Sequence, residues 1–89
     1  MYYTYVLEIS KKNTITIYVG STSNLKNRLD NHKDNSVKTT KKHQFVKLIY
    51  YEACLNKTDA LKRENQLKTG FGRGYIKRRL KTYFVNKRD

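Results

Sequence analysis

The stretch IYVGSTSNLKNRLDNH, residues 17–32, joins a strand-like run to a helix-like run. β-branched and aromatic residues end at a polar turn, and apolar residues then recur with helical spacing. Leu25 and Leu29 mark the inward face of that helix. Arg28 and His32 fall on the same stripe, because residues three and four positions apart share a helix face. A cationic and an ionisable side chain therefore stand where core residues are expected.

The rest of the chain continues the same alternation of strand-like and helix-like runs. Composition and periodicity predict strands over residues 2–9, 15–19 and 45–51, and helices over about 24–33, 58–68 and 75–84. Polar turns are expected at 10–14 and 20–23, a mobile basic loop at 34–43, and a glycine-rich break in TGFGRG, residues 69–74. The order β-β-α-β-α-α predicts an α+β fold, in which a small three-stranded antiparallel sheet is flanked by helices.

The size of the chain predicts a single domain, which we place at residues 1–84 with a short basic tail at 85–89. No apolar run approaches the length of a membrane span, and no signal peptide is visible. Cys54 is the only cysteine and cannot form an internal disulfide, so an intracellular, cytoplasmic location is expected. The Cys, His, Asp and Glu positions form no zinc-type pattern.

Basic residues dominate the charge of the chain. Twenty Lys and Arg against seven Asp and Glu give a net charge of +13. Such a charge indicates a polyanionic partner, with nucleic acid first, an acidic membrane surface second, and a merely solvated surface as the alternative. The segment from Lys68 to Lys81 holds six basic residues and no acidic one. The candidate nucleic-acid contacts are Lys38, Lys41, Lys42, Lys68, Arg73, Lys77, Arg78, Arg79 and Lys81.

A second ionisable residue lies on a core-facing stripe. Glu64 follows Ala60 and Leu61 at helical spacing, and a half-buried carboxylate costs several kcal/mol unless it is paired or metal-bound. An internal Arg28–Glu64 ion pair is one explanation, and an arginine with a buried stem and a solvated head is another for Arg28 alone. The functional explanation is a shared site, with Arg28 for a phosphate, Glu64 for Mg²⁺ and His32 for proton transfer.

Tyrosines add to this convergence. Tyr3 and Tyr5 point to one face of the first strand, and Tyr18 lies near the end of the second. Each alone is more often a packing residue. A phenol with a reference pKa of about 10 also needs a nearby cation, or an acceptor such as His32, to act as a base at neutral pH.

Four elements in one order resemble the GIY-YIG nuclease superfamily. They are Tyr3-Thr4-Tyr5, Tyr18-Val19-Gly20, Arg28, and Glu64 within ALKRENQLK. The stretches YVGSTSNLKNRLDNH, FVKLIYYE and ALKRENQLKTGFGR are similar to the short single-domain, UPF0213-like subgroup, and the likeness runs from about Tyr2 to Leu80. The chain departs from the pattern in having Tyr-Thr-Tyr for Gly-Ile-Tyr, and Ser21 and Thr22 where some members carry a lysine. It also has no securely matched asparagine after the Glu64 helix.

The resemblance implies a three-stranded antiparallel sheet flanked by helices and metal-dependent cleavage of phosphodiesters with Mg²⁺ or Mn²⁺. It implies that Tyr5 helps to activate water or acts as general base, and that Tyr18 positions water or phosphate. Arg28 would stabilise transition-state charge, Glu64 would be the sole carboxylate metal ligand, and His32 would take a proton. For Gly20 we expect that the missing Cβ allows a sharp turn and a close approach of phosphate.

These observations favour a metal-dependent endonuclease that acts on DNA more than on RNA and selects structure more than sequence. We expect a monomer or a weak homodimer. The alternative is a nucleic-acid-binding module with weak or no catalysis. A third reading, a structural or partner-binding basic protein, would leave Glu64 and the tyrosines as packing residues.

Overall fold

The fold consists of one three-stranded sheet and four helices. A computed structural model describes residues 1–11, 14–33 and 45–87. The elements are β1 (Tyr2–Lys11), β2 (Thr14–Thr22), α1 (Leu25–Lys33), β3 (Phe45–Cys54), α2 (Lys57–Leu67), α3 (Gly70–Arg79) and α4 (Lys81–Lys87). The strands are antiparallel in the order β2-β1-β3. The predicted α+β class and element order are confirmed, and the predicted basic loop at 34–43 lies outside the described residues.

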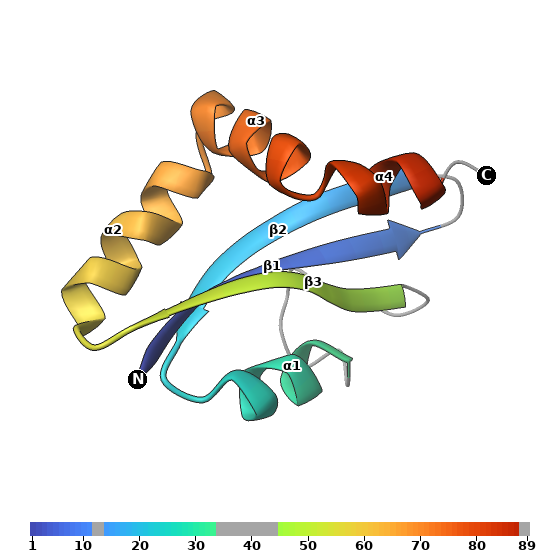
Figure 1. The fold of residues 1–89 in the computed structure, drawn as a ribbon. Coiled ribbons are helices and arrows are strands. Elements are labelled where there is room, and N and C mark those ends of the chain that lie inside the picture. The colour runs from blue at the N-terminus through green and yellow to red at the C-terminus, as the bar shows by residue number, and fades with distance from the viewer. Residues whose placement is uncertain (12–13, 34–44, 88–89) are drawn as a thin grey trace.

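The helices form two layers, one on each face of the sheet. Helix α1 lies on one side, and α3 and α4 lie on the other (Figure 1). Strand β1 serves both layers because its side chains alternate. Tyr5 and Leu7 pack in one cluster with residues of α1, whereas Val6 packs with Leu67 and Ile76 of α2 and α3. The central strand is therefore buried on both faces.

The first two strands are longer than predicted. They pair from Lys11 opposite Thr14 to Tyr3 opposite Thr22, so the polar residues expected in turns at 10–14 and 20–23 lie largely in strands. The prediction was wrong because backbone pairing, not side-chain polarity, sets where a hairpin ends. As a result Ser21 stands directly opposite Thr4 on β1.

The glycine-rich segment before the last helix is helical, contrary to the prediction of a break. Thr69 caps α3, because its hydroxyl accepts the N–H of Gly72. A Cβ on Gly72 would lie 2.3 Å from the backbone of Leu67, so this glycine permits close packing of α3 on the end of α2. The single helix predicted over 75–84 is instead divided at Leu80 into α3 and α4.

Helix α4 is attached to the central strand. The Tyr83 hydroxyl donates a 2.9 Å hydrogen bond to Glu8 Oε1, and Lys47 Nζ lies 5.1 Å from the centre of the Tyr83 ring. Glu8 is buried on β1, so this bond supplies a partner for a carboxylate in the core. Within the described part of the chain, no helix has the length and apolar character needed to cross a membrane.

Candidate active site

A buried tyrosine–histidine pair lies between the sheet and α1. Tyr5 on β1 is 2% exposed and His32 on α1 is fully buried. The Tyr5 hydroxyl is 3.0 Å from His32 Nε2. The ring of Tyr18 on β2 completes the group, with its centre 5.1 Å from that of His32 and 6.3 Å from that of Tyr5. Three predicted site residues are therefore in one cluster, and the half-buried Tyr18 is its most exposed member.

The surroundings keep this pair neutral. Burial, and then the neighbouring Tyr18, raise the pKa of Tyr5 well above the usual phenol value, although the charge of Arg28 opposes the rise. Burial lowers the pKa of His32, and the charge of Arg28 lowers it further. Because the phenol keeps its proton and the imidazole is uncharged, the Tyr5 O–H is suited to donate to an unprotonated Nε2.

Gly20 makes room for the ring of Tyr5. The two residues are opposite each other on β2 and β1. A Cβ on Gly20 would lie 2.5 Å from the Tyr5 hydroxyl oxygen and 2.6 Å from the Cζ atom of that ring. The expected reason for this glycine, a sharp turn, is wrong because Gly20 lies within β2. The glycine instead fixes where the Tyr5 hydroxyl lies.

Glu64 projects from α2 toward the end of β2. Its side chain is 16% exposed. Its Oε1 accepts a 2.6 Å hydrogen bond from Ser21 Oγ, and its Oε2 lies 2.7 Å from Lys68 Nζ. Burial raises the pKa of this carboxyl, but the hydrogen bonds from Lys68 and Ser21, with the charges of Lys68 and Arg28, lower it overall. Glu64 is therefore ionised at neutral pH, and its ion pair is with Lys68 rather than with Arg28.

Arg28 lines a cleft beside this carboxylate. The cleft has a volume of about 410 Å³ and is also lined by Ser21 and Thr22 at the end of β2. Sequence reasoning missed Ser21 as the partner of Glu64 because it placed residue 21 in a turn. The register of the hairpin would have placed Ser21 near α2. Thr4 Oγ1 donates to the Ala60 carbonyl of α2 at 2.9 Å, and Ser21 lies opposite Thr4, so both side chains are on the same face of the sheet.

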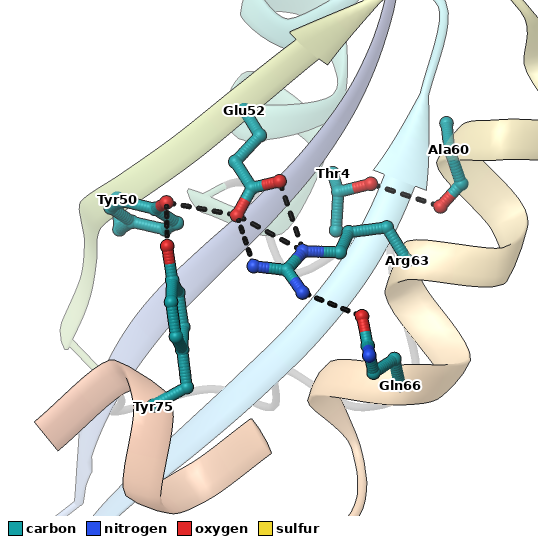
Figure 2. Close-up of polar contacts among 7 residues, drawn as sticks. All are labelled: Thr4, Tyr50, Glu52, Ala60, Arg63, Gln66 and Tyr75. Atoms are coloured by element: carbon teal, nitrogen blue, oxygen red, sulfur yellow. Dashed lines mark hydrogen bonds and ion pairs between the residues drawn. The ribbon is translucent and has the colours of Figure 1, made fainter. Parts of the chain in front are cut away.

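A polar network holds α2 against β3 (Figure 2). Arg63 donates to both carboxylate oxygens of Glu52, through Nε at 3.0 and 3.1 Å and through Nη2 at 2.9 Å. Tyr50 donates to Glu52 Oε2 at 2.8 Å, and its hydroxyl is 3.2 Å from that of Tyr75 on α3. The guanidinium also lies 4.7 Å from the centre of the Tyr75 ring. Because Arg63 precedes Glu64, this network fixes the segment of helix from which Glu64 projects.

The predicted basic contacts fall into two groups. Lys68, Arg73, Lys77, Arg78, Arg79 and Lys81 are all exposed on the end of α2, on α3 and at the start of α4. Lys38, Lys41 and Lys42 lie outside the described residues. Lys68 differs from the others because its ammonium is bound to Glu64, which ties the basic surface to the site.

Comparison with known proteins gives the class of domain to which this fold and these side chains belong. The family described as GIY-YIG catalytic domain matches residues 1–76, and the chain belongs to this family. A UPF0213 protein of Pediococcus pentosaceus is 41% identical over 68 residues, covering 75% of this chain and 68% of the relative. A UPF0213 protein of Syntrophus aciditrophicus is 40% identical over 68 residues, covering 74% and 75%. No solved structure matches. The resemblance inferred from the sequence is thereby confirmed.

Proposed function

We propose that this chain is an endonuclease that hydrolyses phosphodiester bonds of DNA with a divalent cation, Mg²⁺ or Mn²⁺. The observation that carries the proposal is the convergence of the Tyr5–His32 pair, Arg28 and Glu64 where β2 ends. The charges of Arg28 and Glu64 both act on the phenol of Tyr5. A cation, a carboxylate and a neutral proton acceptor are the groups that phosphodiester hydrolysis requires. Membership of a nuclease family supports the same reaction.

The tyrosines and the histidine accept and transfer the proton of the attacking water. Tyr18 is half-buried whereas Tyr5 is 2% exposed, so we assign the contact with water to Tyr18. Tyr5 packs against both Tyr18 and His32, and its hydroxyl is bonded to His32 Nε2. Water loses its proton as the new oxygen–phosphorus bond forms and the bond to the leaving oxygen breaks. The proton passes through the hydroxyls to His32, and the leaving oxygen takes a proton from solvent. The lowered pKa of His32 keeps the acceptor unprotonated before the reaction.

Arg28 stabilises the charge that gathers on the phosphate as its bond to the leaving oxygen breaks. It is half-buried on α1 and lines the cleft beside Ser21. A guanidinium is suited to this role because it stays charged and can donate two parallel hydrogen bonds to phosphate oxygens.

Glu64 fits a single hard cation. The described residues contain no group of three or more His, Cys, Asp or Glu side chains that could hold a metal, so Glu64 would be the only carboxylate ligand. Mg²⁺ is commonly held by one or two carboxylates together with water and phosphate oxygens. Glu64 is ionised, and Ser21 orients its Oε1. The Lys68 ammonium is paired with Oε2, and a metal ion would take its place there. When bound, the metal would polarise the phosphate and activate water.

The basic surface of α3 and α4 supports binding to the phosphate backbone. Its exposed lysines and arginines give affinity without reading bases, since phosphate contacts carry no sequence information. We therefore propose selection of DNA structure over sequence, by a monomer or a weak homodimer.

The test is cleavage of labelled single-stranded, duplex and flapped DNA with Mg²⁺, with Mn²⁺ and with EDTA. Glu64→Gln should abolish cleavage and retain DNA binding, because it removes the charge and keeps the shape of the side chain. Tyr18→Phe should lower cleavage by about 10²-fold or more. Tyr51→Phe is the matched control, because Tyr51 is 52% exposed on β3 and its ring contacts Tyr3, so its loss of a hydroxyl should change cleavage little.

A binding module without catalysis is the second candidate. It is favoured by the burial of the Tyr5–His32 pair and by the engagement of both Glu64 oxygens within the chain. Tight, salt-sensitive binding with no metal-dependent product on any of the three substrates would select this candidate over the endonuclease.

A further inference from the structure

The cleft next to Glu64 has a lining that extends beyond the groups used in catalysis. Four elements build it: the start of β1 with Tyr2, the end of β2 with Ser21 and Thr22, and the first turns of α1 and α2. Ser21 faces the cleft and also donates to Glu64 Oε1. The cleft is therefore continuous with the proposed site of cleavage.

The charges of the lining favour an anion with two negative groups. Arg28 comes from α1 and Lys57 from α2, which belong to different layers of the fold. Among the described residues that line the cleft, none has an acidic side chain. The hydroxyl of Ser23 adds a hydrogen-bond donor to the lining, whereas the Thr22 hydroxyl donates to the Asn24 carbonyl at 3.3 Å. Two cations on separate walls can each bind one phosphate group.

The remaining wall is apolar and suits a sugar and a base. Tyr2, Ala60 and Leu61 line it, and Leu61 is 43% exposed although it is a leucine on a helix. An aromatic ring next to a basic groove is the usual platform for an unpaired base, because every base has a face that can stack. A paired base would be held in its duplex and could not enter the cleft.

We propose that this cleft binds the unpaired nucleotide next to the scissile phosphate, with Lys57 contacting the neighbouring phosphate. The proposal rests on the proposed nuclease function and gives it a substrate class: DNA with at least one unpaired nucleotide at the cleavage position, as in a flap or a single strand. Arg28 holds the scissile phosphate, the apolar wall holds the nucleoside, and Lys57 holds the next phosphate along the strand.

The probe is thymidine 3′,5′-bisphosphate, which carries one nucleoside between two phosphates. It is titrated into the ¹⁵N-labelled full chain in EDTA, so that binding does not depend on a metal. Amide shifts are expected at Thr22, Lys57 and Leu61. Lys57→Gln should weaken binding about tenfold through the loss of one charged contact. Lys62→Gln makes the same charge change on the exposed, opposite side of α2 and should change binding less than twofold. Thymidine 5′-monophosphate should bind equally to both variants.

Equal weakening by Lys57→Gln and Lys62→Gln would overturn the proposal, because it would show only diffuse attraction to a basic protein. Absence of shifts around the cleft would overturn it as well. Failure of the nuclease function is distinguishable, since it appears as no metal-dependent cleavage and leaves the titration unchanged. In a cleaving enzyme, Lys57→Gln should lower cleavage of flapped DNA about tenfold relative to Lys62→Gln. Equal cleavage rates for the two variants would exclude the proposed nucleotide site but not the proposed nuclease function.

Discussion

The contact between Gly20 and Tyr5 allows a quantitative test by Gly20→Ala. The new Cβ would lie 2.5 Å from the Tyr5 hydroxyl oxygen, whereas ordinary contact begins at 3.4 Å. The ring is 2% exposed, so it must move within the core, and such overpacking costs about 1–3 kcal/mol. The displaced hydroxyl also loses its bond to His32 Nε2, worth about 1 kcal/mol. Alanine also restricts the unfolded chain more than glycine does, and this offsets about 0.5 kcal/mol of the loss in stability.

The net loss is therefore about 1.5–3.5 kcal/mol, which lowers the Tm of a domain of this size by roughly 6–28 °C. Thermal unfolding followed by circular dichroism measures it. Gly70→Ala is the matched control, because a Cβ there meets nothing within 4 Å and Ala favours the helix that begins at Gly70. If Gly20→Ala melts within about 2 °C of the unmodified chain, the Tyr5 ring does not lie against Gly20 and the reasoning fails.

Three further perturbations follow from the site and its support. Glu52→Gln should lower the free energy of unfolding by about 1–2 kcal/mol by breaking the Arg63 pair. Because the pKa of Glu52 is lowered, this contribution is present above pH 4.5 and is lost as the pH falls through the folded pKa. Urea unfolding should therefore show a smaller difference between the variants at pH 3 than at pH 7. Because the pKa of His32 is lowered in the folded chain, the unfolded chain takes up a proton at a higher pH than the folded chain does. The free energy of unfolding should therefore decline as the pH falls below 6.5. His32→Asn should reduce this decline in unfolding curves measured between pH 7 and pH 5. Lys68→Met should strengthen Mn²⁺ binding about fivefold, because the ammonium no longer competes for Glu64 Oε2. Electron paramagnetic resonance of free Mn²⁺ measures this affinity. An unchanged affinity would mean that the metal does not bind at Glu64.

The placement of Arg28 and His32 was predictable because helical periodicity depends on local sequence alone. Leu25 and Leu29 fixed the inward face, and His32 is indeed buried on it. The Lys68 partner of Glu64 was also within reach of the sequence, since residues four apart on a helix are neighbours. The pairing expected instead, between Glu64 and Arg28, would have joined two different helices.

The remaining contacts depend on how distant segments meet, which periodicity does not encode. The Ser21–Glu64 bond requires β2 to continue past its glycine, and that is decided by pairing with β1. The Glu52–Arg63 bond joins a strand to a helix across the sheet. Gly72 was interpreted as a helix breaker, although its missing Cβ serves a close approach to Leu67 that only the folded chain contains.

The hydrogen bond between Tyr83 and Glu8 has a consequence for how the protein is made. The two residues are 75 positions apart, and Glu8 lies on β1, the first of the three strands in the chain. At 5–20 residues per second, that strand waits about 4–15 s for its last partner. A lone hairpin is at best marginally stable, so during this interval the apolar centre of the future sheet is open to other nascent chains. Helix α4 can therefore cover β1 only after all the residues between Glu8 and Tyr83 have been synthesised.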